Sequence, residues 1–387
     1  MLYRTDKKTG NQLSALGLGC MRFPRNKSET EKLILDAIDG GVNYFDTAYI
    51  YPNSEATLGE ILAKYNKRKD VYIATKLPLF MGKSAAVYEK IFQEQLRRLQ
   101  TDYIDYYFMH SITDMAHWQN YLDHGIVAWL NEKRAAGQIK HVGFSYHGTY
   151  QEFVKVLDSY DWEFCMIQYN YYDEHYQAGR AGLDAAAAKG IAVMIMEPLL
   201  GGALANGLPQ RAKDVFHKAD ASMSPVDWAF HWLWHQPAVT VVLSGMGSSE
   251  QLKQNIASAS NFTPLADDDF SVYAQVKNIF SESYKIPCTG CNYCLPCPQG
   301  INIPGCFSSY NTSYFQGYVR GASLYYTTTG IMKKNPNSPH KCNQCGKCEK
   351  HCPQHIPIRQ DIKKVAKRFE PLPLKWLLNV VRKVVTK

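Results

Sequence analysis

Short apolar runs rich in β-branched and aromatic residues alternate with stretches of helical periodicity from about residue 13 to residue 260. Such runs are typical of buried strands, and their regular alternation with helices is typical of consecutive β–α units. Eight runs are predicted to be strands, namely Leu13–Cys20, Val42–Asp46, Val71–Lys76, Tyr103–Met109, Ile139–Ser145, Phe164–Gln168, Ile191–Met196 and Val239–Ser244.

The stretches between these runs predict helices, for example Glu55–Tyr65, Ala86–Leu99 and the alanine-rich Leu183–Lys189. Gly190 stands where a helix should stop before the next strand. Eight β–α units within about 250 residues predict an α/β fold of the (β/α)8 TIM-barrel type. The first units carry no G-x-G-x-x-G after a strand, which argues against a Rossmann fold.

Two cysteine runs follow the barrel-like part. They contain Cys288, Cys291, Cys294 and Cys297, followed by Pro298, and Cys342, Cys345, Cys348 and Cys352, followed by Pro353. The second run has the C-x2-C-x2-C-x3-C-P spacing that holds a [4Fe–4S] cluster. Zinc sites usually take two well-separated ligand pairs, and disulfide frameworks suit short secreted chains. We therefore expect two [4Fe–4S] clusters.

The first run is one residue shorter before its proline than the ferredoxin pattern. In that pattern the cysteine before the proline reaches the neighbouring cluster. The shorter gap leaves open whether Cys297 ligates in this crossed fashion or whether Cys306 takes its place.

The pattern changes near residue 264, which predicts three parts. These are a barrel (1–265), a C-terminal α-helical ferredoxin-like iron–sulfur domain (266–370) and a tail (371–387). A Tyr-, Gly- and Thr-rich insert, Asn311–Pro339, separates the cysteine runs and either covers the substrate mouth or packs between module and barrel. The tail reads as a basic amphipathic helix, which either packs on the protein's own surface or makes peripheral membrane contact.

The net charge of +8 is modest for 387 residues, and with no nucleic-acid-binding motif we expect no nucleic-acid partner. The chain opens without the apolar core of a signal peptide and has no uninterrupted apolar run of membrane-spanning length. Thiolate ligands for iron require a reducing compartment. We therefore expect a cytoplasmic protein.

Polar residues at the C-terminal ends of barrel strands line the active mouth. Asp46, Tyr51, Lys76 and His110 follow or close the second, third and fourth predicted strands. A cationic Lys76 would favour the phenolate of Tyr51 and make it a general acid at neutral pH. Asp46 would hold Lys76, and His110 would orient a carbonyl oxygen.

The motifs DTAYIY, IATK and FMH around these residues resemble those of the aldo-keto reductase family, over about residues 1 to 260. With its cysteine module, the chain is similar to ferredoxin-fused aldo-keto reductase-like oxidoreductases. The resemblance implies a carbonyl or alcohol substrate and NAD(H) or NADP(H) across the barrel mouth. It implies carboxamide contacts from Ser145 and Gln168, with Asn170 nearby, and a nicotinamide contact at Met196. It implies a pyrophosphate segment at Glu197–Gly202, with Pro198, Leu199 and Gly201, and an adenosine segment at Ser244–Asn255, with Gly245, Met246 and Gln251.

Departures from the family bear on the choice of cofactor. Met196 stands where many members stack an aromatic ring on the nicotinamide. Gly245 and Gln251 stand where NADP-preferring members carry Lys and Arg for the 2′-phosphate. Losing two cations removes charge-assisted hydrogen bonds, so we expect weak discrimination for NADPH or a preference for NADH. The substrate pocket is expected to include Tyr49, Trp118, Tyr146, His147 and Tyr171.

The two halves pose a problem, because a nicotinamide gives up two electrons together and a [4Fe–4S] cluster passes one at a time. The clusters either conduct electrons from an external ferredoxin-like carrier, hold the C-terminal module in place as structural elements, or sense redox state. Conduction requires a flavin or a radical-tolerant substrate. The alternative to an enzyme is a redox-sensing or electron-transfer protein whose barrel binds nicotinamide or flavin.

Overall fold

The computed structural model describes residues 1–331 and 336–371. The chain forms two compact units. The first contains Met1–Pro198 and Asp227–Leu265, and the second contains Leu199–Val226 and the chain from Ala266 on. The second unit therefore includes Leu199–Val226, a segment that falls within the predicted barrel (1–265). The division into domains at residue 265 stays a prediction.

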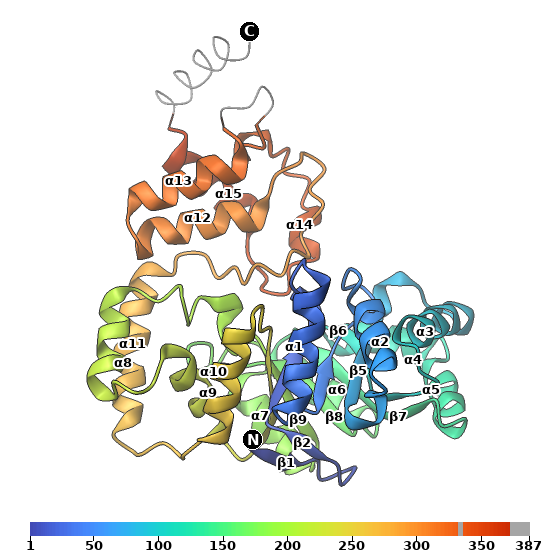
Figure 1. Ribbon diagram of the computed structural model, residues 1–387. Coiled ribbons are helices and arrows are strands. Elements are labelled where there is room, and N and C mark those ends of the chain that lie inside the picture. Colours follow the sequence, from blue (N-terminus) through green and yellow to red (C-terminus); the bar gives the residue numbers. More distant parts are fainter. Residues whose placement is uncertain (332–335, 372–387) are drawn as a thin grey trace. The chain divides into compact units, whose positions relative to one another are not determined.

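The first unit is a closed barrel of eight parallel strands, which confirms the predicted TIM-barrel fold (Figure 1). Each strand pairs with the next along the chain, and the last strand closes the barrel against the first. The strands are β3 (Leu16–Gly19), β4 (Tyr44–Asp46), β5 (Tyr72–Pro78), β6 (Ile104–Ile112), β7 (Ile139–Tyr146), β8 (Phe164–Gln168), β9 (Ala192–Met196) and β10 (Val239–Ser244).

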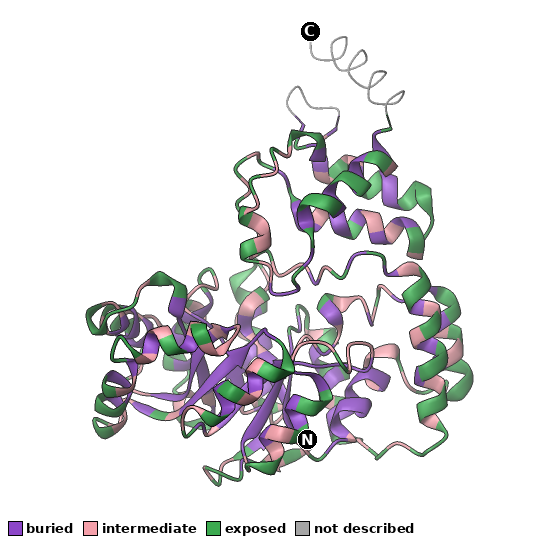
Figure 2. Cartoon of the chain, turned by 180° about the vertical axis from the view of Figure 1, so that it is seen from behind, coloured by how far each residue is buried: buried purple, intermediate pink, exposed green. Residues whose placement is uncertain are grey.

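Large side chains fill the barrel interior, including Tyr44, Tyr106, Phe108 and Phe164. Their rings meet edge to face, with Tyr106 and Phe164 at 4.9 Å and Phe108 and Phe164 at 4.7 Å between ring centroids. The barrel strands are buried almost throughout, as Figure 2 shows. The barrel is thus a packed core, and reactive groups are available only at the strand ends.

Helices of this unit cover the outside of the strands. Several begin at a short polar side chain that accepts a backbone hydrogen bond, as Asp114 does from the His117 N–H at 2.7 Å. The helices are α1 (Lys27–Asp39), α2 (Ser54–Lys64), α3 (Ala85–Leu99), α4 (Met115–Leu122), α5 (Ile126–Ala135), α6 (Tyr150–Asp158), α7 (Gly179–Ala188), α9 (Pro225–Trp234) and α10 (Ser249–Ser260).

The predicted first strand, Leu13–Cys20, is divided. Its first part belongs to β2 (Gln12–Ser14), which pairs antiparallel with β1 (Tyr3–Thr5), and only β3 enters the barrel. Ser14 marks the change of direction, because its hydroxyl donates to the Leu16 carbonyl at 2.7 Å. A continuous apolar pattern does not reveal such a break.

The second unit is helical. Its helices are α8 (Gln210–Ala219), α11 (Asp269–Ser283), α12 (Ile303–Phe315), α13 (Tyr318–Thr329), α14 (Lys347–Lys350) and α15 (Ile358–Phe369). The predicted insert forms part of α12 and all of α13. Tyr325 of α13 stacks on Phe369 of α15 at 4.6 Å between centroids, so the insert packs inside this unit.

The predicted tail helix, Leu372–Lys387, lies outside the described residues. Among the residues that the structure describes, no helix is both long and apolar enough to cross a membrane.

Candidate active site and cysteine centre

Asp46 and Lys76 form a buried ion pair at the ends of neighbouring strands. Asp46 ends β4, which pairs with β5, and Lys76 lies two residues beyond the position opposite Asp46. Lys76 Nζ lies 2.5 Å from Asp46 Oδ1 and donates a second hydrogen bond to the Thr47 carbonyl at 2.7 Å. Their side chains are 2% and 6% exposed, so solvent hardly screens the pair.

Burial shifts both pKa values toward the neutral forms. It raises the pKa of the Asp46 carboxyl and lowers the pKa of the Lys76 ammonium, and in each case the partner's charge offsets part of the shift. Attraction within the pair therefore maintains charges that burial alone would disfavour.

Tyr51 and His110 lie beside this pair. The Tyr51 ring centroid is 5.4 Å from Lys76 Nζ and 6.4 Å from the His110 ring, and the two rings are perpendicular at 86°. His110 lies on β6 opposite Pro78 of β5, which brings it to the same strand ends as Lys76. The four residues singled out from the sequence thus lie together at one end of the barrel.

The His110 imidazole is buried, and this burial lowers its pKa well below the usual value of 6.5, with further lowering by the Lys76 charge and by His147. At neutral pH the ring is therefore uncharged. A neutral imidazole carries one N–H, which can donate a hydrogen bond to an oxygen without giving up its proton.

A buried polar network behind Lys76 was not recognised in the sequence. Gln95 Nε2 donates to the Lys76 carbonyl at 3.1 Å and to Glu55 Oε1 at 2.9 Å. Thr75 also donates to Glu55, at 2.6 Å, and Arg98 pairs with the same carboxylate at 3.2 Å. Adjacent strand residues face opposite sides, so Thr75 points toward the helices. That alternation is the one signal that could have indicated the network.

The expected carboxamide contacts already have protein partners. Ser145 Oγ accepts from the Ser111 N–H at 2.8 Å. Gln168 donates to Asp173 at 3.0 Å, and its carbonyl accepts from Gln177 at 3.2 Å. Burial raises the pKa of Asp173 to about 6. The Gln168 amide is therefore held in a fixed orientation.

The expected adenosine segment follows β10. Ser244 Oγ accepts from Asn255 Nδ2 at 3.0 Å, and Gln251 Oε1 accepts from the Gly247 N–H at 2.9 Å. Asn170 donates to the Glu197 carbonyl at 3.1 Å, at the end of the neighbouring strands. The Gln251 side chain is thus already used to order the loop that precedes α10.

Part of the expected pyrophosphate segment lies in the second unit, against the first cysteine run. Gly201 has φ +65, and a Cβ built on it would lie 2.1 Å from the Thr289 carbonyl oxygen. Thr289 itself is buried, and its hydroxyl has no hydrogen-bond partner among the described residues. Only a glycine permits this approach of the two loops.

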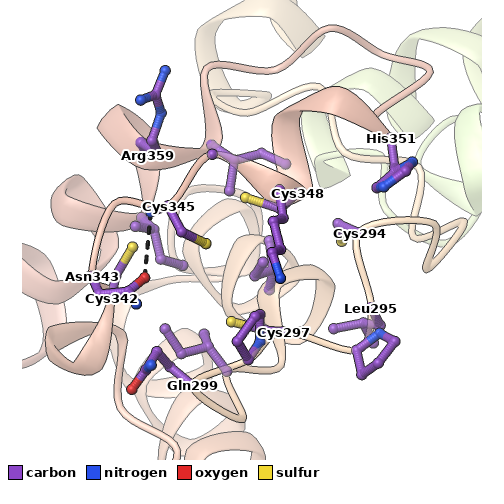
Figure 3. A pocket seen from close by; sticks show the side chains of 18 of the residues that line it. Cys294, Leu295, Cys297, Gln299, Cys342, Asn343, Cys345, Cys348, His351 and Arg359 are labelled. Carbon is purple, nitrogen blue, oxygen red and sulfur yellow. Dashed lines mark hydrogen bonds between the residues drawn. The ribbon is translucent and has the colours of Figure 1, made fainter.

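Cysteines from both runs line one cavity of about 160 Å³ in the second unit. In Figure 3 the sulfur atoms of Cys297, Cys345 and Cys348 face a common space. Cys342 and Cys294 also line the cavity, and Cys345 is exposed. This volume is far larger than a single ion or water needs.

The remaining cysteines of the runs gather around Cys294. Burial raises the Cys294 pKa to about 12, and the thiols close enough to raise it further are Cys288, Cys291 and Cys352. Cys306 instead lies in the apolar core of the unit with Phe307 and does not line the cavity. The two groupings mix the runs, as crossed ligation requires.

The thiol set fits iron–sulfur clusters. Within the described residues, no three histidine, cysteine, aspartate or glutamate side chains converge tightly enough for a single metal ion. A four-iron cluster has a different requirement, because each iron takes one thiolate and the sulfurs stand apart around it. Soft thiolates around a roomy cavity meet that requirement.

Two residues expected in the substrate pocket have packing roles. Trp118 of α4 is fully buried and packs on Trp162 at 5.1 Å between ring centroids. Tyr49 lies under the Arg98 guanidinium, 4.4 Å from ring centroid to Cζ. Tyr146, His147 and Tyr171 are also buried. Because Trp118, Tyr146, His147 and Tyr171 are buried, their accessible surface gives no support to a substrate pocket. The pocket assignment stays a prediction.

Comparison with known protein families gives two matches. The model of the Aldo/keto reductase family matches residues 15–278, and that of the 4Fe-4S dicluster domain matches residues 287–356. The two matches confirm the family resemblance and the 4Fe-4S domain that the motifs indicated.

Individual relatives match the first part. The 6-dehydroglucose reductase of Novosphingobium aromaticivorans is 27% identical over 274 residues, which covers 65% of this chain and 88% of that protein. The NADH-specific methylglyoxal reductase of Escherichia coli is 25% identical over 292 residues, which covers 63% of this chain and 86% of that protein.

Among solved structures, the holo form of aldo-keto reductase AKR11C1 from Bacillus halodurans has a similar fold. The TM-score is 0.60 at 23% sequence identity, and the match covers 71% of this chain and 96% of that chain.

Proposed function

The chain belongs to the aldo/keto reductase family, and we propose that its barrel transfers a hydride between a nicotinamide cofactor and a carbonyl or alcohol substrate. The observation that carries this proposal is the grouping of Tyr51 and His110 around the buried Lys76–Asp46 pair. The two family matches show that the protein is an oxidoreductase of this family with a 4Fe-4S dicluster domain. That conclusion does not depend on the roles proposed here for single residues.

In the reducing direction, a bound reduced nicotinamide supplies the hydride to the carbonyl carbon. The Tyr51 hydroxyl gives its proton to the carbonyl oxygen, so the carbonyl gains the hydride, which carries both electrons, and one proton, and becomes an alcohol. The Lys76 charge stabilises the phenolate that remains. His110, uncharged, donates a hydrogen bond to the same oxygen and stabilises its developing charge.

NADH is the proposed cofactor. Gly245 and Gln251 offer no cation for a 2′-phosphate, and the Gln251 side chain accepts from the Gly247 N–H. That the related Escherichia coli protein is NADH-specific by name supports this choice. Binding would involve Ser145 and Gln168 at the carboxamide.

The cysteine centre is proposed to hold two [4Fe–4S] clusters. Cys288, Cys291, Cys294 and Cys352 would hold one, and Cys297, Cys342, Cys345 and Cys348 the other. Cluster chemistry is one-electron transfer, so linking it to a hydride requires a one-electron carrier such as a ferredoxin and either a flavin or a radical-tolerant substrate.

The contact between Gly201 and Thr289, both in the second unit, joins the expected pyrophosphate segment to the first cysteine run and so supports a link between cofactor binding and the clusters. The same contact supports a second candidate function. In that case the barrel binds nicotinamide or flavin as a signal, and the clusters sense redox state. Slow or absent turnover of many aldehydes and ketones, together with tight cofactor binding, would favour sensing.

The deciding experiment is Tyr51→Phe, measured with NADH and a panel of aldehydes and ketones. We expect turnover to fall by about a hundredfold to ten-thousandfold while NADH affinity is retained, because only the proton donor is removed. Tyr65→Phe is the control, since Tyr65 is exposed and its hydroxyl donates to the Glu31 carboxylate. Turnover by Tyr51→Phe near that of the wild type would eliminate this mechanism.

The cluster proposal has its own experiment. Anaerobic purification, followed by iron and sulfide counts, EPR and an absorption spectrum, should give about eight irons per chain for two clusters. A flavin absorption spectrum would identify a flavin as the group that links two-electron hydride transfer to one-electron transfer by the clusters. A cytoplasmic location and membrane contact by the tail remain predictions.

A further inference from the structure

The segment of the second unit that carries the cysteine runs, from Tyr284 to residue 371, has a one-sided charge. No aspartate or glutamate occurs between Tyr284 and Cys348. The carboxylates that follow, up to residue 371, are Glu349, Asp361 and Glu370. Glu349 pairs with Arg359 at 2.7 Å, Asp361 pairs with Lys364 at 2.6 Å, and Glu370 is buried, where it accepts from Ser338 at 2.7 Å. Each carboxylate between Tyr284 and residue 371 is therefore already engaged.

The positive charges are exposed and gather around the second cysteine run. Lys341, Lys347, Lys350, Arg359 and Lys363 are all exposed, and we call them the basic patch. Lys347 and Arg359 line the cysteine cavity. Figure 3 shows Arg359 and Cys345 on the same side of that cavity.

The cavity mouth also has the composition of a transient interface. Cys345 is exposed, and the apolar Leu295, which is 36% exposed, lines the same cavity. Small apolar centres with charged rims suit brief encounters between redox proteins, in which charge steers approach more than it adds affinity.

We propose that the basic patch docks a small acidic one-electron carrier protein and presents it to the cluster beside Cys345. Charge complementarity selects the occupant, because the patch has five exposed cations and its nearest carboxylate is paired with Arg359. This inference rests on the proposed function, which supplies the cluster. It identifies the surface at which the electron donor or acceptor of that cluster binds. In each encounter one electron passes, so the carrier is oxidised as the cluster is reduced, or the reverse.

The test uses the full holoprotein and a strongly acidic [2Fe–2S] ferredoxin as the probe, with binding measured by calorimetry at low and high salt. The variant Lys341→Glu, Lys350→Glu, Lys363→Glu changes exposed residues outside the cavity lining. We expect its affinity to fall by about tenfold or more, and wild-type binding to weaken steeply with salt. The matching Lys→Gln variant should have an intermediate effect.

The control variant is Lys7→Glu, Lys69→Glu, Lys90→Glu, which makes the same charge change at exposed barrel positions. Iron counts and EPR spectra establish that each variant keeps its clusters. Equal losses in the patch and control variants would overturn the proposal. So would equal binding of a non-redox protein of the same charge, or patch-dependent binding to phosphatidylglycerol vesicles without binding to ferredoxin.

Docking is measured without substrate or nicotinamide, so it does not depend on turnover. Normal patch-dependent docking without carbonyl turnover would defeat the proposed function alone. Turnover with clusters present but without patch-dependent binding would defeat the docking surface alone.

Discussion

Gly201 and Thr289 approach so closely that a single methyl group on Gly201 would lie 2.1 Å from the Thr289 carbonyl oxygen. Thr289 directly follows Cys288, so the loop expected to bind the cofactor pyrophosphate and the loop that begins the cysteine centre fit against each other. A change in either loop must therefore be felt by the other.

We predict that Gly201→Ala disturbs both functions. The added Cβ meets backbone rather than a flexible side chain, and φ +65 disfavours any residue with a Cβ. NADH affinity should weaken and the EPR signal of the cluster held by Cys288 should change, as fluorescence titration and EPR would measure.

Gly202→Ala is the matched control. Gly202 has φ +97, but a Cβ there would meet nothing within 4 Å. Its effect should be confined to backbone strain of about 1–2 kcal/mol, with the EPR signal unchanged. If both variants change the EPR signal equally, strain rather than the contact with Thr289 is responsible.

The buried pair predicts a specific pattern of stability. Lys76→Met leaves the Asp46 carboxylate buried without its cation and should lower the free energy of unfolding of the barrel by about 3–5 kcal/mol. The double variant Asp46→Asn, Lys76→Met should recover much of that loss, because no unpaired charge remains. Denaturant unfolding followed by tryptophan fluorescence measures both. Additive losses would show that the two charges do not depend on each other.

The low pKa of His110 predicts the pH dependence of stability. The folded state holds this ring uncharged below pH 6.5, whereas the unfolded chain binds a proton there, so stability falls as pH falls below about 6.5. The contribution of this residue to the slope is at most about 1.4 kcal/mol per pH unit. His110→Gln should remove it, as unfolding curves at a series of pH values would measure.

The exposed His124 supplies the control, and His124→Gln should leave the slope as it is in the wild type. The pH–activity profile of the wild type should likewise show no loss of activity near pH 6.5 that is absent from the profile of His110→Gln. Such a loss would mean that the ring is charged during turnover.

The sequence predicts the barrel well because burial of parallel strands leaves a long, regular apolar signal. The sequence predicts the structure less well where a continuous apolar pattern is interrupted or where an aromatic residue near the site has a packing role. Leu13–Cys20 is continuous in pattern but is divided at Ser14, and Trp118 is aromatic near the site but packs on Trp162. The contact of Gly201 with Thr289 joins positions far apart in sequence, and no local pattern encodes such a contact. The crossed grouping of the cysteines, in contrast, follows from the spacing of the second run, and only the shortened first run leaves its fourth ligand open.

Cofactor preference follows from the residues near β10. We predict a lower KM for NADH than for NADPH, or little difference between them. Gly245→Lys with Gln251→Arg should improve the KM for NADPH by about tenfold or more by adding charge-assisted hydrogen bonds to the 2′-phosphate. Gln254→Arg, which adds one of these charges elsewhere on α10, should not. A strong NADPH preference of the wild type would contradict the role given to these two positions.

The cysteine centre offers the sharpest distinction between two neighbouring thiols. Cys297 lines the cavity with the second run, whereas Cys306 is buried with Phe307, and burial raises its pKa to about 12. The ligands of a cluster surround one space, and Cys306 lies outside the cavity that Cys297 shares with the second run. Cys297→Ser should therefore lower the iron content from about eight to about four per chain, and Cys306→Ser should leave it at about eight. The reverse result would assign the fourth ligand to Cys306 and would mean that the shortened first run does not ligate in the crossed arrangement.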